Sequence, residues 1–254
     1  SLIFSRLTPL NEDGKVEPDL ASELEISADR ITYVFQLRAN AYWHDGTPVT
    51  ADDVIFTIGM LKNADFPGPP TLGSEVWRAV DVQVVDRYTV RFILPEPFAP
   101  FLDYTTVDIV PAHILAGTPV ADLANVTFSH APVGCGPFRL TEIETGEDEE
   151  IDAMVLEQHT GYYRERPYLE RIQFRFYPSD QSAMDAYQAN EVEGIAQIPV
   201  NMLARASTYP EMNLYSAQIA EYGLVYFNMA DPELPFQDIE VRQALLYALD
   251  RQRI

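Results

Sequence analysis

Hydrophobic and polar residues alternate most regularly between residues 31 and 38. The apolar members lie at every second position: Ile31, Tyr33, Phe35 and Leu37. A period of two is typical of a strand that buries one face. We therefore expect a strand here, with these four side chains directed into a core.

From residue 50 onward the apolar spacing changes to three and four. Val54, Ile58 and Leu61 form the stripe of an amphipathic helix. Thr50 stands at the N-cap position, and Asp53, three residues later, is a shorter substitute for the glutamate of a capping box. The preceding Asp-Gly-Thr-Pro at 45–48 has turn chemistry. The pattern predicts a strand, a turn and a helix that packs on the strand.

The same reading extends along the rest of the chain. Further strands are predicted at residues 23–26, 80–85, 88–94, 138–144, 151–158, 171–177 and 222–228. The first forms a hairpin with the strand at 31–38, and those at 80–85 and 88–94 form another. Helical segments are predicted at 18–21, 200–206 and 238–254, and at 179–187 with Ser179 or Asp180 as the cap. A helix or a pair of short helices, broken at Pro111, is predicted at 101–116. Residues 1–10 read as a helical turn or strand end, and the Pro- and Gly-rich run 64–73 as a loop. Helices mixed with antiparallel hairpins predict a mixed α+β fold.

Length and hydropathy narrow the class of protein. The 254 residues suffice for one large domain or two lobes, and 47% hydrophobic with 22% charged residues is ordinary globular composition. The sequence has no apolar run of about 18 residues, so we expect no direct membrane insertion. Its first residues lack the pattern of a signal peptide.

The charge balance is strongly acidic. Seventeen basic against 39 acidic residues give a formal net charge of −22. This charge repels phosphate backbones, so we do not expect the protein to bind nucleic acid. We interpret the charge as an aid to solubility in a crowded or salty compartment; a preference for cationic ligands is the alternative. The single cysteine, Cys135, excludes an internal disulfide.

No residue pattern indicates catalysis, a metal site or a cofactor. The four histidines are far apart, and with one cysteine they do not form a zinc motif. His44 and Asp45 could form a dyad, but neighbours in a turn seldom face each other, and there is no nucleophile elbow. Gly134-Cys135-Gly136 lacks a third glycine and precedes Pro137, so it is read as a structural or ligand-lining bend. A hydrolase with two carboxylates stays an alternative, because 39 acidic residues make spacing uninformative.

Five segments, taken in order, resemble the family 5 solute-binding proteins of peptide and nickel ABC importers. The segments are 20–26 (LASELEI), 33–38 (YVFQLR), 43–54 (WHDGTPVTADDV), 132–138 (PVGCGPF) and 241–251 (VRQALLYALDR). The third is similar to the family pattern fhDGtplTAeDV, and the fourth to PvGTGPy. Two departures stand out: Cys135 replaces a threonine, and 158–163 (QHTGYY) lacks the usual Asn-Pro and Trp.

The resemblance implies a periplasmic-binding-protein-like α/β fold, with lobes built from mixed β-sheets flanked by helices. Residues 5–110 would form the accessory lobe, 1–4 and 111–218 part of the first main lobe, and 219–254 the start of the second. By this comparison we expect the chain to be incomplete, lacking the first strand and the C-terminal half of the family.

The resemblance also implies a function. It indicates a periplasmic or otherwise extracytoplasmic receptor, monomeric and not an enzyme, that captures peptides and delivers them to ABC-transporter permease subunits. A nickel chelate, sugar or opine would be the alternative solute. The residue that captures a peptide amino group is expected in the absent lobe. The ligand-lining candidates are Gly134, Cys135, Gly136, Gln197, Ile198, Pro199, Tyr222, Gly223 and Leu224.

Overall fold

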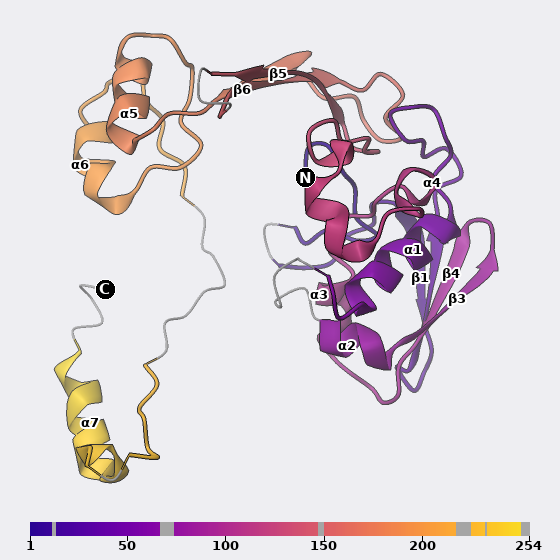
Figure 1. The fold of residues 1–254 in the computed structure, drawn as a ribbon, viewed down its shortest axis with the longest axis horizontal. Helices are drawn as coiled ribbons and strands as arrows, with labels where there is room; N and C mark the ends of the chain where they lie inside the picture. Colours follow the sequence, from indigo (N-terminus) through magenta and orange to yellow (C-terminus); the bar gives the residue numbers. More distant parts are fainter. Residues whose placement is uncertain (12–13, 67–73, 147–149, 217–224, 232, 250–254) are drawn as a thin grey trace. The chain divides into compact units, whose positions relative to one another are not determined.

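Two units make up the chain in the computed structural model: unit 1, Ser1–Ile195, and unit 2, Ala196–Ile254 (Figure 1). The structure describes residues 1–11, 14–66, 74–146, 150–216, 225–231 and 233–249, with the side chains of 74, 124 and 125 excepted. Each unit is considered by itself. Helices and sheets are both present, as the sequence predicts.

A four-stranded antiparallel sheet forms the first part of unit 1. Its spatial order is β1 (Ala21–Ile26), β2 (Thr32–Leu37), β4 (Thr89–Ile93) and β3 (Asp81–Asp86). The alternation predicted for β2 is confirmed, because Tyr33, Phe35 and Leu37 are buried. Both predicted hairpins, β1–β2 and β3–β4, are also confirmed.

Helix α1 (Ala51–Lys62) packs against β3 and β4 (Figure 1). Its N-terminus is held by the buried carboxylate of Asp53. This group accepts hydrogen bonds from the backbone N–H of Thr50 (2.8 Å), the backbone N–H of Ala112 (2.9 Å) and the indole Nε1–H of Trp43 (3.4 Å). The first bond is the one expected of a capping box. The other two fix the helix start to two other segments.

Aromatic side chains fill the core between α1 and the sheet. The ring centroid of Phe92 lies 5.3 Å from that of Phe35, 5.7 Å from Phe101 and 5.9 Å from Trp77. Trp77 comes from α2 (Ser74–Ala79), a helix that was not predicted. The predicted loop 64–73 is described only as far as Phe66, and the rest lies outside the described residues.

Of the two alternatives predicted for 101–116, the pair of short helices broken at Pro111 is confirmed. The structure has two four-residue helices, α3 (Phe101–Tyr104) and α4 (Ala112–Leu115). Pro111 stands at the N-cap of α4, since proline cannot continue a helix but is tolerated before its first turn. Short 3-10 helices follow, η2 (Val120–Asn125) and η3 (Thr127–Ser129).

The helical segment predicted at 18–21 is wrong. The backbone N–H groups of Leu20 and Ala21 donate to the carbonyl oxygens of Arg6 and Leu7, at 3.0 and 3.1 Å, so they are unavailable for a helical turn. Arg6 is paired in turn with Asp108 through an isolated antiparallel bridge. The first ten residues therefore behave as a strand end.

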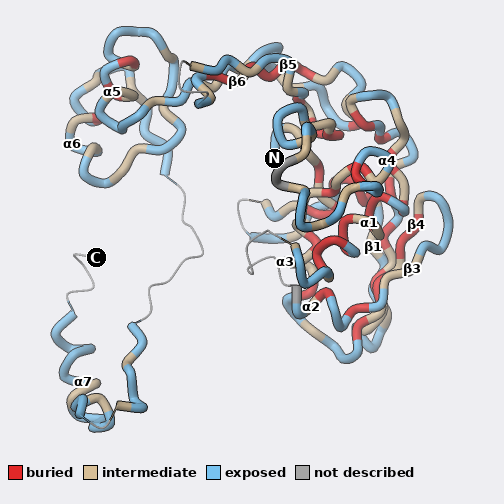
Figure 2. Tube along the Cα trace, viewed as in Figure 1, coloured by how far each residue is buried: buried red, intermediate tan, exposed pale blue. Residues whose placement is uncertain are grey.

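A second antiparallel sheet has the order β5 (Phe138–Thr145), β6 (Ile151–Gln158) and β7 (Arg171–Arg175). Helix α5 (Asp180–Gln188) follows β7 and is capped as predicted, because the Ser179 hydroxyl accepts the backbone N–H of Ser182 at 3.1 Å. Figure 2 shows that red, buried positions concentrate in the first sheet and α1.

Unit 2 contains short elements: η4 (Val200–Met202), α6 (Leu203–Ala206), η5 (Pro235–Gln237) and α7 (Ile239–Ala248). The helix predicted to begin near Asp238 is confirmed, and the Asp238 carboxylate caps it by accepting the Glu240 N–H at 2.8 Å. A strand was predicted for 222–228. The described part of this range, 225–228, forms no strand, and no described strand pairs with it. Among the described helices, none combines the length and apolar character required to span a bilayer.

Candidate functional site

The bend Gly134–Cys135–Gly136 lies between the start of the chain and the turn at His44. The Gly136 N–H donates to the carbonyl oxygen of Ile3 at 2.8 Å. On the other side, the His44 N–H donates to the carbonyl oxygen of Gly134 at 2.7 Å. Three segments that are distant in sequence therefore meet through backbone hydrogen bonds.

Both glycines are required by this close approach. A Cβ at Gly134 would lie 1.8 Å from the carbonyl oxygen of Ile3, and one at Gly136 would lie 2.6 Å from that of Leu2. Neither separation is compatible with a side chain. The glycines are thus explained by backbone packing, and their predicted contact with a ligand stays a prediction.

Cys135 is fully buried between them. Its carbonyl oxygen accepts the hydroxyl of Ser5 at 3.3 Å. Burial raises the pKa of the thiol to about 12. Because the thiolate is the reactive form, this cysteine is chemically inert in the fold.

His44 connects the turn at 44–48 to the same bend. Its Nδ1 accepts the Gly134 N–H at 3.2 Å, so Nε2 carries the proton and donates to the Gly136 carbonyl oxygen at 3.1 Å. Burial lowers the pKa of His44 to about 4, which keeps the ring neutral. Asp45 bonds to His113 instead (2.7 Å), so the His44–Asp45 dyad does not form.

The other predicted site residues are elsewhere. Gln197 is exposed, while Ile198 and Pro199 are half-buried, and all three belong to unit 2 just before η4. Tyr222, Gly223 and Leu224 lie outside the described residues.

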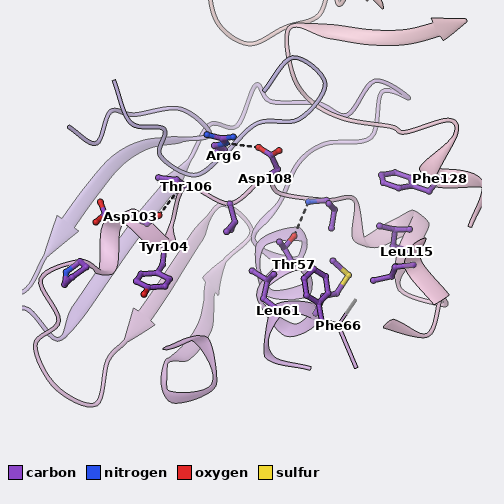
Figure 3. A pocket seen from close by; sticks show the side chains of 15 residues that line it. Arg6, Thr57, Leu61, Phe66, Asp103, Tyr104, Thr106, Asp108, Leu115 and Phe128 are labelled. Atoms are coloured by element: carbon purple, nitrogen blue, oxygen red, sulfur yellow. Dashed lines mark hydrogen bonds and ion pairs between the residues drawn. The ribbon is translucent and has the colours of Figure 1, made fainter. Parts of the chain in front are cut away.

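Sequence reasoning missed a hollow beside the C-terminal end of α1 (Figure 3). Its volume is about 660 Å³, within the range of about 300–1,000 Å³ typical of small-molecule sites. We call it the α1 groove. Its apolar lining comprises Met60, Leu61, Phe66, Val107, Leu115 and Phe128. Met60, Leu61 and Leu115 belong to α1 and α4, but Phe66 and Val107 lie in irregular segments, where periodicity gives no signal.

Polar groups gather along one side of the α1 groove. The Arg6 guanidinium donates from Nε to Asp108 Oδ1 at 2.9 Å, and both side chains are 36% exposed. The terminal nitrogens of Arg6 have no bonding partner among the described residues. Asp103 is exposed and lies beside Tyr104 (Figure 3). The described residues include no cluster of three His, Cys, Asp or Glu side chains suited to a metal ion.

Comparison with known proteins gives consistent matches along the chain. The oligopeptide-binding protein AppA of Bacillus subtilis is 29% identical over 259 aligned residues, covering 100% of this chain and 46% of the relative. The dipeptide-binding protein of Escherichia coli is 30% identical, covering 94% and 47%. The chain therefore spans about half the length of these curated relatives.

Solved structures agree in fold. NikZ from Campylobacter jejuni, crystallised with Ni(L-His), superposes with a TM-score of 0.81 at 25% identity, covering 99% of this chain and 48% of that chain. This likeness confirms the predicted periplasmic-binding-protein-like fold. Residues 15–254 match the family described as bacterial extracellular solute-binding proteins, family 5 middle. The chain belongs to the family 5 bacterial extracellular solute-binding proteins.

Proposed function

We propose that the protein is an extracytoplasmic receptor of an ABC importer, which captures a peptide or related small solute and delivers it to permease subunits. The observation that carries this proposal is the family match over residues 15–254. The α1 groove supports it, because it offers a concave, mainly apolar surface of suitable volume. Family members are transport binding proteins, and we propose a binding role without catalysis here.

Peptides are the favoured solute. The names of the curated relatives cited above specify oligopeptide and dipeptide binding. Other structural relatives widen the range, since AgaA of Agrobacterium was crystallised with agropinic acid and is 29% identical with a TM-score of 0.70. A nickel chelate or an opine is accordingly the alternative.

The arrangement into lobes is part of the proposal. Residues 5–110 would be the accessory lobe, 1–4 and 111–218 part of the first main lobe, and 219–254 the start of the second. A receptor of this type closes on its solute by a hinge motion. The predicted lining residues, Gly134–Gly136, Gln197–Pro199 and Tyr222–Leu224, would then face the solute through backbone groups, which accept many side chains. We also propose that the receptor works as a monomer.

Native mass spectrometry of the protein purified from its source tests the solute class. We expect a bound mass corresponding to short peptides, and added peptides should raise the melting temperature, because a ligand that binds the native state stabilises it. A nickel chelate, sugar or opine in place of peptides would refute the peptide assignment. Turnover of chromogenic peptides or glycosides, abolished by one acid-to-amide substitution, would refute the receptor role itself.

A further inference from the structure

The α1 groove combines a deep apolar floor with one cationic group. Met60, Leu61 and Leu115 are 7%, 4% and 3% exposed, so they form a floor with little remaining contact with solvent. Phe66 and Phe128 are half-buried and form part of the walls. An aliphatic or aromatic group that enters the groove gains free energy mainly because its own apolar area is removed from water.

Arg6 is the basic residue in the lining. It uses Nε for Asp108 and leaves its two terminal nitrogens for another acceptor. A guanidinium presents five N–H donors in a planar fork that matches a carboxylate. Asp108 holds the fork in place at 2.9 Å while occupying only one edge of it. Figure 3 shows this pair at the side of the groove above the apolar residues.

The acidic charges of the protein restrict where an anion can bind. Asp103 and Asp108 also line the groove, so a carboxylate is favoured only at the open edge of Arg6. The net charge of −22 opposes anions at long range, but salt at physiological strength screens charges more than about 8 Å apart. A direct contact with Arg6 is much less affected by this screening.

We infer that the α1 groove binds the carboxylate end of an apolar solute, with the carboxylate on Arg6 and the apolar body over Met60, Leu61 and Leu115. The chemistry fits an apolar C-terminal residue of a peptide and also a medium-chain fatty acid. The biological meaning of this site rests on the proposed receptor function. The binding of a carboxylate at Arg6 does not depend on that function, so an experiment can refute either one without the other.

Calorimetric titration of the full chain with two matched probes tests the inference. Octanoate and octanamide share an apolar body and differ in charge. We expect octanoate to bind at least about tenfold more tightly, as a charge-assisted hydrogen bond would provide. Equal affinities, or no binding of octanoate at millimolar concentration, would overturn the inference.

Variants locate the effect. Arg6→Gln should abolish the preference for octanoate, whereas Arg6→Lys, which keeps the charge but loses the fork, should retain part of it. Arg87→Gln, at the β3–β4 turn away from the groove, is the matched control and should leave the preference unchanged. Val107→Trp, which narrows the groove, should weaken both probes. Retention of the full preference in Arg6→Gln, or of both affinities in Val107→Trp, would contradict the site.

A second pair of probes distinguishes the source of the carboxylate. N-acetyl-Phe-Leu with a free C-terminus is compared with its C-terminal amide. Tighter binding of the free acid than of octanoate identifies a peptide terminus as the natural ligand. The reverse order identifies a fatty acid and leaves the groove chemistry intact, while it counts against peptides at this site. Circular dichroism melts verify that each variant is folded.

Discussion

Removal of the Asp53 carboxylate should destabilise unit 1 more than any neighbouring surface substitution. The side chain is 4% exposed and accepts N–H groups from Thr50, Ala112 and Trp43. Asp53→Ala would leave these donors without an acceptor in a place that water hardly reaches. The start of α1 would also lose its link to α4.

The magnitude follows from the geometry. A hydrogen bond to a charged group contributes about 1.5–3 kcal/mol. Two of the three bonds are short, at 2.8 and 2.9 Å, and the indole bond at 3.4 Å is weak. We expect Asp53→Ala to lower the free energy of unfolding by about 3–5 kcal/mol. Asp53→Asn, which keeps one acceptor oxygen, should cost about 2 kcal/mol.

Urea unfolding followed by tryptophan fluorescence measures the loss. Both tryptophans, Trp43 and Trp77, are buried in unit 1, so the signal reports that unit. Asp52→Ala is the control: Asp52 is exposed in the same helical turn, and its interaction with the helix dipole is worth about 0.3–1 kcal/mol. If Asp53→Ala costs no more than Asp52→Ala, the reasoning about the buried carboxylate is refuted.

Three further outcomes follow from the bend at Gly134 and from α1. Gly134→Ala should destabilise the protein by about 2 kcal/mol or more, because its Cβ would meet the Ile3 carbonyl. Gly59→Ala lies in open space within α1 and should stabilise the protein by about 0.5–1 kcal/mol. Thermal melts of the two variants measure the difference. Cys135 should resist iodoacetamide at pH 8 and react in urea, and fast labelling of the folded protein would contradict its raised pKa. The unfolded state binds more protons than the fold between pH 6.5 and about 4, since the pKa of His44 is lowered from 6.5 to about 4, so stability should fall by about 2 kcal/mol as pH drops through this window. His44→Asn should flatten this dependence of stability on pH, and an unchanged slope would refute the assignment of the effect to His44.

Local patterns predicted those elements whose cause is local. The alternation of β2, the caps of α1 and α5 and the start of α7 near Asp238 depend on residues within one or two turns of each other, and these predictions are confirmed. The break at Pro111 within 101–116 is local in the same sense, because it follows from the chemistry of proline, and it is confirmed.

Long-range features could not be derived in this way. Nothing near Gly134 in the sequence indicates that the carbonyl oxygen of Ile3 excludes a side chain there. The α1 groove is likewise assembled from segments 6, 57–66, 100–115 and 123–128, which come together only in the fold. The family motif in 43–54 predicted the kind of protein, yet its Trp43 and Asp53 serve to hold α1 in place.

The contact between the first residues and the bend at Gly134–Gly136 also determines how early this part of the chain can fold during synthesis. Ser5 and Cys135 are hydrogen-bonded although they lie 130 positions apart. At a synthesis rate of 5–20 residues per second, the first residues wait roughly 6 to 26 seconds for their partners to be made. Throughout that interval the apolar side chains of Leu2, Ile3 and Phe4 lack the strand-like partners at 134–138. Closing this loop is therefore expected to be a late step in folding.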